Sequence, residues 1–216
     1  MKQLVTLIVV AGSLFAHSQT TQKNQAGEIR GTVIDQNFIP VSGATVYAVP
    51  QGLALNEVTP RSVKADRNGV FDFHGKLPLG AYKLYAEKDA DAYPDPLDGF
   101  YADAKNKAAK VELTENRPSA AVTVRLGAKA GVVSGRVIDA GTGKDLKALL
   151  AFVDNEGNGH TISVDGSYHI LVPPGKDVTL MVTVMGTASN RSQIPVAPLR
   201  LEPGQFVSMD LPVSRD

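Results

Sequence analysis

One stretch of the sequence brings together aromatic rings and carboxylates, two side-chain types suited to binding a polar ligand. Its residues of interest are Tyr93, Asp95, Asp98, Phe100 and Tyr101. Rings stack on the apolar faces of sugars, and carboxylates accept hydrogen bonds from hydroxyl groups. Pro94, Pro96 and Gly99 predict an exposed loop. We therefore expect a weak carbohydrate-binding site on this loop; the alternative is a loop whose rings fold back onto the edge of the domain.

The residues of common catalytic sites are missing or wrongly spaced. A zinc peptidase site needs His and Glu side chains that converge on one ion, and none of His74, His160 and His169 has a Glu three positions on. The sequence contains no Cys nucleophile, no Gly-x-Ser-x-Gly motif and no glycine-rich loop before a helix. Paired carboxylates serve glycosidases, but those around Asp95 lie on a loop that does not fix their separation. We predict no enzymatic activity, no catalytic residue, no metal and no cofactor.

A second polar motif, Asp66-Arg67-Asn68-Gly69, resembles the start of a calcium-binding loop. Only the first two oxygen ligands of such a loop are present, and no Glu stands at its closing position. A tight turn in which Asn68 or Gly69 takes a left-handed conformation explains the same residues. We predict a simple turn between two strands.

The elements that must position these residues occur twice in the chain. The string Gly31-Thr32-Val33-Ile34-Asp35 returns as Gly135-Arg136-Val137-Ile138-Asp139. A proline-glycine turn recurs later in each copy, as Leu77-Pro78-Leu79-Gly80 and as Val172-Pro173-Pro174-Gly175. The repeated order of strand, turn and strand indicates two copies of one module.

Short strands account for nearly all of the chain. The segments are rich in Val, Ile, Tyr and Phe, and many alternate apolar with polar residues. We expect strands at 28–34, 44–49, 70–73, 81–86, 111–113, 121–126, 162–164, 168–172, 178–185, 199–201 and 206–211. The one candidate helix, 102–110, lacks an apolar stripe, so a short exposed turn is expected there. The pattern predicts an all-β fold of two antiparallel β-sandwich modules in tandem.

A short segment of small residues, Gly127-Ala128-Lys129-Ala130-Gly131, separates the two copies. We place the first module at residues 27–127 and the second, more divergent module at residues 128–214. Because this linker is short, we expect the modules to pack end to end around a hinge rather than to tumble freely. The absence of Cys means that apolar burial alone must stabilise both cores.

The first 18 residues have the organisation of a secretory signal peptide. Lys2 provides a positive charge, residues 4–15 form an apolar run, and Ala16-His17-Ser18 places small residues where a signal peptidase reads. The apolar run is shorter than the about 20 residues that span a bilayer. We predict a signal peptide at residues 1–18, no membrane insertion after its cleavage, and a secreted or periplasmic protein of a bacterial envelope.

Charge argues against nucleic acid as a partner. Lys and Arg together number 22, as do Asp and Glu, and basic residues form no run. The chain therefore lacks the basic patch that binds phosphate backbones or anionic membranes. Acidic residues do crowd between Glu87 and Asp103, where Lys88 is the one basic residue.

Several motifs of the first copy keep a characteristic spacing. They are Gly31-x-Val33-x-Asp35, Pro40-Val41-Ser42-Gly43-Ala44-x-Val46, Asp66-x-x-Gly69-x-Phe71-x-Phe73 and Leu77-Pro78-x-Gly80-x-Tyr82. This pattern, which covers residues 28–126, resembles the carboxypeptidase regulatory-like domain family. The resemblance implies a prealbumin-like or transthyretin-like β-sandwich, often grouped with carbohydrate-binding-like folds and found in exported bacterial proteins. The second copy departs from the pattern, with Lys147 in place of Gly43 and a shortened turn at Asp165-Gly166.

Together these observations predict an exported, non-catalytic protein of two β-sandwich modules. The most specific expectation is weak carbohydrate binding by the loop at residues 93–101. The alternative is a structural spacer or accessory protein that docks onto another envelope or secreted protein, for example by lending an edge strand. The expected partner is thus a glycan or another envelope protein.

Overall fold

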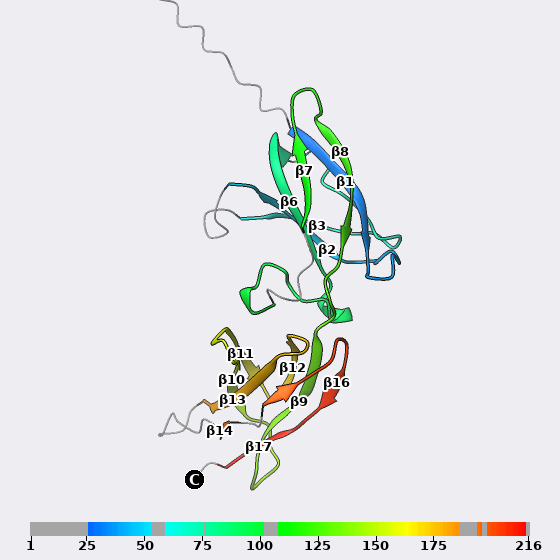
Figure 1. The fold of residues 1–216 in the computed structure, drawn as a ribbon. Coiled ribbons are helices and arrows are strands. Elements are labelled where there is room, and N and C mark those ends of the chain that lie inside the picture. Colours follow the sequence, from blue (N-terminus) through cyan, green and yellow to red (C-terminus); the bar gives the residue numbers. More distant parts are fainter. Residues whose placement is uncertain are drawn as a thin grey trace, which may run out of the picture.

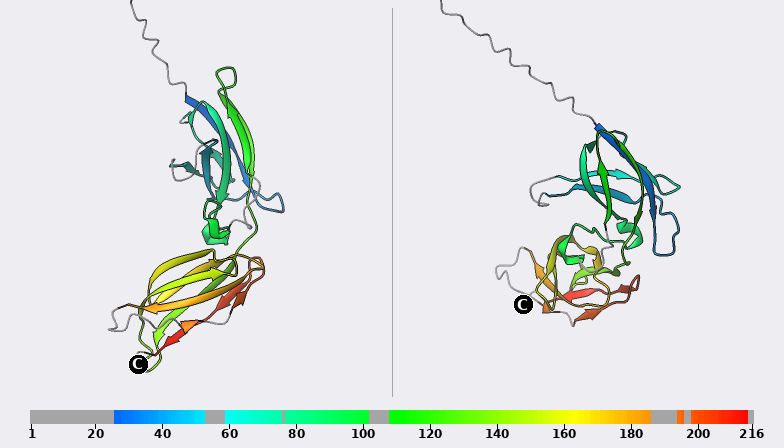
Figure 2. Two further views of the ribbon diagram at one scale, coloured as in Figure 1. Left: turned by 60° about the vertical axis from the view of Figure 1, so that its left-hand side comes forward. Right: turned by 45° about the horizontal axis from the view of Figure 1, so that its top comes forward.

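The chain forms two β-sandwich modules stacked end to end (Figure 1). The computed structural model describes residues 26–52, 59–75, 77–101, 108–185, 194–195 and 198–214. The signal peptide expected at residues 1–18 lies outside the described residues, as does most of the candidate helix. Figure 2 shows the modules from two further sides, with the segment around residues 89–101 between them.

Module one consists of two sheets packed face to face. β4 and β5 pair with one edge of β1 and β8 with its other edge, whereas the second sheet has the order β3-β2-β6-β7. β8 runs parallel to β1, and the other pairs are antiparallel. The strands are β1 Ala26–Ile34, β2 Thr45–Pro50, β3 Arg61–Lys64, β4 Val70–Asp72, β5 Leu77–Pro78, β6 Gly80–Glu87, β7 Ala109–Leu113 and β8 Ser119–Arg125.

Module two is built on one continuous path of strands, in the order β14-β13-β10-β11-β12-β9-β16. The path turns a corner between β11 and β12, which share the single pair Asp165 and Ser167 around Gly166 at φ +80°. The strands are β9 Gly131–Asp139, β10 Lys147–Asp154, β11 Gly159–Asp165, β12 Ser167–Val172, β13 Asp177–Val184, β14 Ile194–Pro195, β15 Leu199–Arg200, β16 Phe206–Ser208 and β17 Leu211–Val213.

The two modules share one topology. β9 pairs antiparallel with β12 and parallel with β16 and β17. In the same way, β1 pairs antiparallel with β4 and parallel with β8. β10 lies between β11 and β13, as β2 lies between β3 and β6. Even single hydrogen bonds correspond, because Val33 N–H donates to Gly69 O and Val137 N–H to Gly166 O, both at 2.8 Å. The repeated string therefore builds the same central strand in both modules.

The first glycine of each repeated string is required by the parallel strand beside it. A Cβ atom on Gly31 would lie 1.8 Å from the carbonyl oxygen of Val122 in β8. A Cβ atom on Gly135 would lie 1.8 Å from the carbonyl oxygen of Met209, between β16 and β17. Only glycine permits such an approach of two backbones.

Each sandwich encloses an apolar core that follows the alternation of its strands. In β6 the buried side chains are Tyr82, Leu84 and Ala86, whereas Lys83 is exposed. Tyr85 is half-buried on the opposite face, as its odd spacing from Tyr82 predicts. The all-β architecture of two tandem sandwiches expected from the sequence is thus confirmed.

The turn at Asp66 is also confirmed. The Asp66 Oδ1 atom accepts hydrogen bonds from the backbone N–H groups of Asn68 at 2.8 Å and Val70 at 2.9 Å. Gly69 adopts φ +75°, the left-handed conformation that closes the turn. The Asp66 Oδ1 atom is therefore engaged in hydrogen bonds within its own turn.

The observed strands differ in detail from the predicted ones. Residues 206–211 were expected as one strand, but β16 ends at Ser208 and β17 begins at Leu211. Between them, the Arg136 N–H donates to the Asp210 side chain at 2.9 Å instead of a backbone carbonyl. β3 was not predicted, because Val63 is the one apolar residue among its four and no alternation is visible.

Candidate functional site at the junction of the modules

The acidic loop after β6 is an ordered connector. It contains two short 3-10 helices, η1 Asp89–Asp91 and η2 Gly99–Tyr101. Asp95 Oδ1 accepts the N–H of Leu97 at 2.8 Å, and Asp98 Oδ1 accepts the N–H of Phe100 at 2.9 Å. These two carboxylates therefore fix turns of the loop, a role that Asp performs through its short side chain.

The structure buries the aromatic rings that were expected on an exposed platform. Tyr93, Phe100 and Tyr101 are only 7%, 3% and 9% exposed. Phe100 and Tyr101 pack edge to face, with ring centroids 5.1 Å apart, and both belong to the apolar core of module two. This corrects the expected platform, because a ring enclosed by protein has no free face to stack on a sugar. Tyr93 folds back onto its own module, as the alternative expected, whereas Phe100 and Tyr101 pack into the neighbouring module.

Polar contacts join the modules around these rings. The Tyr101 hydroxyl donates to the carbonyl oxygen of Leu171 in β12 at 2.9 Å, and burial raises the pKa of that hydroxyl above its usual value. The Ala130 N–H donates to Ala92 O at 2.7 Å. His160 Nδ1 lies 3.3 Å from the Asp98 carboxylate. The linker and the loop are thus bonded to each other and to module two.

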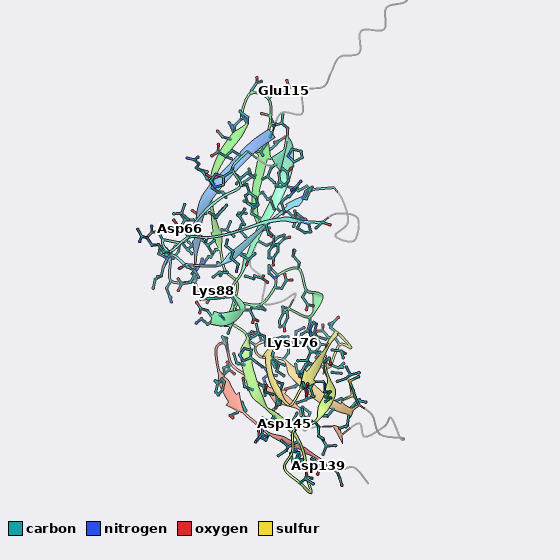
Figure 3. All side chains as sticks on the ribbon, turned by 180° about the vertical axis from the view of Figure 1, so that it is seen from behind. Asp66, Lys88, Glu115, Asp139, Asp145 and Lys176 are labelled. Carbon is teal, nitrogen blue, oxygen red and sulfur yellow. The ribbon has the colours of Figure 1, made fainter. Side chains whose placement is uncertain are left out.

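Figure 3 places this junction within the whole molecule. Lys88, at the start of the loop, lies at the end of module one that faces module two, whereas Glu115 lies at the opposite end. Asp139 and Asp145 lie toward the far end of module two. The loop therefore connects the two facing ends of the sandwiches.

A cleft of about 220 Å³ opens beside the junction. It is lined by Asp35, Gln36, Asn37, Tyr93, Lys129 and Pro203. The Lys129 ammonium lies 5.2 Å from the centre of the Tyr93 ring, a cation–π arrangement. Burial raises the pKa of the Tyr93 hydroxyl, and the charges of Asp35 and Asp91 raise it further. Of the five predicted site residues, only Tyr93 lines this cleft.

The other polar residues of the cleft were not predicted from the sequence. Asp35 ends the repeated string and Lys129 lies in the linker, and they are 94 residues apart in the chain. No local pattern connects them. The repeat was the one available signal, since it places Asp35 at the end of a central strand.

A second cluster lies on the outer face of the β3-β2-β6-β7 sheet. Tyr47 lies directly opposite Tyr85, and its hydroxyl donates to the Glu87 carboxylate at 2.5 Å. Burial raises the pKa of Glu87, the hydrogen bond from Tyr47 lowers it, and the nearby Asp95 and Asp89 raise it again. These groups satisfy one another across neighbouring strands.

Within the described part of module two, Asp154 is the one buried carboxylate. The Asp154 side chain is fully buried, and its oxygens accept hydrogen bonds from Asn158, from the N–H of Glu156 and from Lys176. Burial alone would raise the pKa of Asp154, but these hydrogen bonds outweigh it and hold the pKa below its usual value. The network closes the turn between β10 and β11.

Neither a metal cluster nor a membrane-spanning helix is found in the part of the chain that the structure describes. Within it, no group of three or more His, Asp or Glu side chains is arranged to hold a metal ion. Among the same residues, no helix is both long and apolar enough to cross a membrane.

No protein-family model and no curated protein matches the sequence. The resemblance to the carboxypeptidase regulatory-like family therefore stays a prediction.

The solved structures to which this chain is similar include bacterial pilins. The shaft pilin of Lactobacillus rhamnosus GG is 11% identical, with 88% of this chain and 97% of the pilin covered and a TM-score of 0.36. A minor pilin of Streptococcus agalactiae is 12% identical over 88% of this chain and 96% of its own, with a TM-score of 0.35. The Bacillus anthracis TIE protein is 14% identical over 88% of this chain, with a TM-score of 0.35, but the match covers 34% of its length.

Proposed function

We propose that this chain is a rigid two-module spacer of an exported bacterial protein, non-catalytic and able to hold a partner at a fixed position. The observation that carries this proposal is the insertion of Phe100 and Tyr101 from module one into the core of module two. A flexible pair of domains keeps its cores separate and its linker solvated. In this chain the loop of module one contributes Phe100 and Tyr101 to the core of module two.

The rigidity of the junction follows from the contacts that bending at the linker would break. A rotation at the linker pulls two aromatic side chains into water and breaks the Tyr101 to Leu171 hydrogen bond. Full burial of one large apolar side chain is worth about 1.5–3 kcal/mol, so loss of both rings disfavours the bent state by several kcal/mol. The open state is then populated at well under about 1%.

An apolar tip on module one is the surface best suited to a protein partner. Phe38, Ile39 and Val70 are 71%, 59% and 44% exposed. The loop that carries Phe38 and Ile39 meets the turn that leads into β4, because Gly69 lies against the backbone of Val41 and the ring of Pro40. Phe38 is held at φ +65°, a conformation that bulky residues rarely adopt. The accessory version of the proposal places docking at this tip.

Small-angle scattering and ¹⁵N relaxation of the full chain test the spacer role. We expect one rotational correlation time for both modules and an elongated particle of defined length. In the double variant Phe100→Ala and Tyr101→Ala, the modules should tumble separately and the length distribution should broaden. Phe38→Ala, which removes an exposed ring, is the matched control. Independent tumbling of the wild-type modules contradicts the proposal.

A further inference from the structure

The cleft beside the junction has the size and position of a small-ligand site. Its volume of about 220 Å³ corresponds to roughly seven water molecules. Its walls come from the loop after β1, from Tyr93, from the linker and from module two. Because Asn37, Lys129 and Pro203 are exposed, the cleft reaches the surface. It can therefore hold one unit of a longer molecule as well as a free small molecule.

Tyr93 is the unusual residue of this cleft. Buried tyrosines normally place their hydroxyl on a partner, and Tyr82, Tyr101 and Tyr168 donate to the carbonyl oxygens of Pro78, Leu171 and Met209. Tyr93 is equally buried as a residue, at 7% exposed, but its hydroxyl has no hydrogen-bond partner among the described residues and reaches solvent, since no fully buried side-chain oxygen there lacks a partner. The hydroxyl is thus a polar group with unused bonding capacity at the edge of a cavity.

The charged residues around Tyr93 also have capacity to spare. Asp35 uses Oδ1 to accept the N–H groups of Asn37 at 2.8 Å and Ile39 at 2.9 Å, whereas its Oδ2 has no partner in the part of the chain described. Lys129 faces the Tyr93 ring at 5.2 Å and forms no ion pair with any described residue. The cleft therefore offers an acceptor at Asp35, a donor at Lys129, and a hydroxyl that can do both.

We infer that this cleft binds one neutral sugar residue. Each sugar hydroxyl donates one hydrogen bond and accepts others, so adjacent hydroxyls match a wall on which acceptors and donors alternate. An anionic ligand fits less well, because Asp35 and Asp91 both act electrostatically on Tyr93 and Lys129 is the one cation among the described residues of the cleft wall. The site is distinct from the expected stacking platform and shares only Tyr93 with it. The spacer role does not depend on this site.

The test is a titration of the ¹⁵N-labelled full chain, followed by amide chemical shifts. The probes are glucose, galactose and N-acetylglucosamine, a disaccharide of each, and glucuronic acid as the charged counterpart. We expect at least one neutral sugar to shift the amides of residues 35–37, 93 and 129 with a dissociation constant of about 1 mM, the strength of a few hydrogen bonds. A disaccharide that binds more tightly than its monosaccharide identifies a glycan end as the natural ligand.

Two tyrosine variants separate the site from its surroundings. Tyr93→Phe removes only the hydroxyl and should weaken binding about two- to tenfold, as expected for one hydrogen bond. Tyr85→Phe is the matched control, because Tyr85 lies on the outer face of the β3-β2-β6-β7 sheet, away from the cleft wall; its binding should equal that of the wild type. Unchanged binding by Tyr93→Phe, shifts confined to residues 97–101, or no shift with any neutral sugar overturns the inference. Tighter binding of glucuronic acid than of glucose overturns the inference that the ligand is a neutral sugar.

Discussion

Replacement of Phe100 by Ala removes the ring that module one places in the core of module two. The side chain is 3% exposed and lies edge to face with Tyr101 at a centroid distance of 5.1 Å. If the ring belongs to that core energetically as well as geometrically, its loss should destabilise module two, although residue 100 belongs to module one in the sequence.

The expected magnitude follows from the burial of the ring. Truncation of a core Phe to Ala usually lowers the free energy of unfolding by about 3–5 kcal/mol, through lost transfer energy and the cavity left behind. The edge-to-face pair contributes about 1 kcal/mol of this. If module two keeps its fold when the loop detaches, the loss is limited to the free energy of docking. With an m-value of about 2 kcal/mol/M, a loss of 4 kcal/mol lowers the urea midpoint by roughly 2 M.

The assay is urea unfolding followed by near-ultraviolet circular dichroism and by resolved amide signals of each module. Signals from β10 and β13 should lose their dispersion at lower urea in Phe100→Ala than in the wild type, and those from β2 and β6 should shift less. Phe38→Ala serves as control, because its ring is 71% exposed and surface changes usually stay within about 0.5 kcal/mol.

One result refutes the reasoning directly. If Phe100→Ala unfolds module two at the same urea concentration as Phe38→Ala, the ring contributes nothing to that core. The modules are then independent, and the proposed rigidity of the junction is lost with it.

Two further predictions concern module two. Gly135→Ala should lower the free energy of unfolding of module two by about 1–3 kcal/mol or more, because the new Cβ atom would lie 1.8 Å from the Met209 carbonyl oxygen. Gly141→Ala is the control and should change the stability little, because its Cβ atom would meet only Asp139 Oδ1, at 3.5 Å. Equal urea midpoints for the two variants would contradict the close approach. Because the folded-state pKa of Asp154 is lowered, its ionised form stabilises the module above the unfolded pKa of about 3.9, and this contribution is lost as pH falls through the folded pKa. Asp154→Asn should therefore lose less stability than the wild type between pH 7 and pH 3 in urea unfolding, and an identical pH dependence would exclude this role.

Local patterns were enough to predict much of each module. The strand β6 was found because Tyr82, Leu84 and Ala86 alternate with polar residues, and a strand has only two faces. The turn at Asp66 was found because Asp, Asn and Gly favour one local backbone path. β3 was not predicted, because its four residues show no strand pattern. It is a strand because it pairs with β2.

The sequence alone determined the duplication, the all-β class and the central strand of each module, because these depend on residues close together in the chain. The repeated string shows this most clearly, since it forms the central strand of each module, β1 and β9. Tertiary structure alone decided where the aromatic side chains of the loop at residues 93–101 pack. The composition of residues 93–101 suits an exposed loop and an interface equally, and only the position of module two buries Phe100 and Tyr101. Asp35 and Lys129 line one cleft because β8 pairs with β1 up to Ile34 and Arg125, a long-range pairing that no local pattern contains.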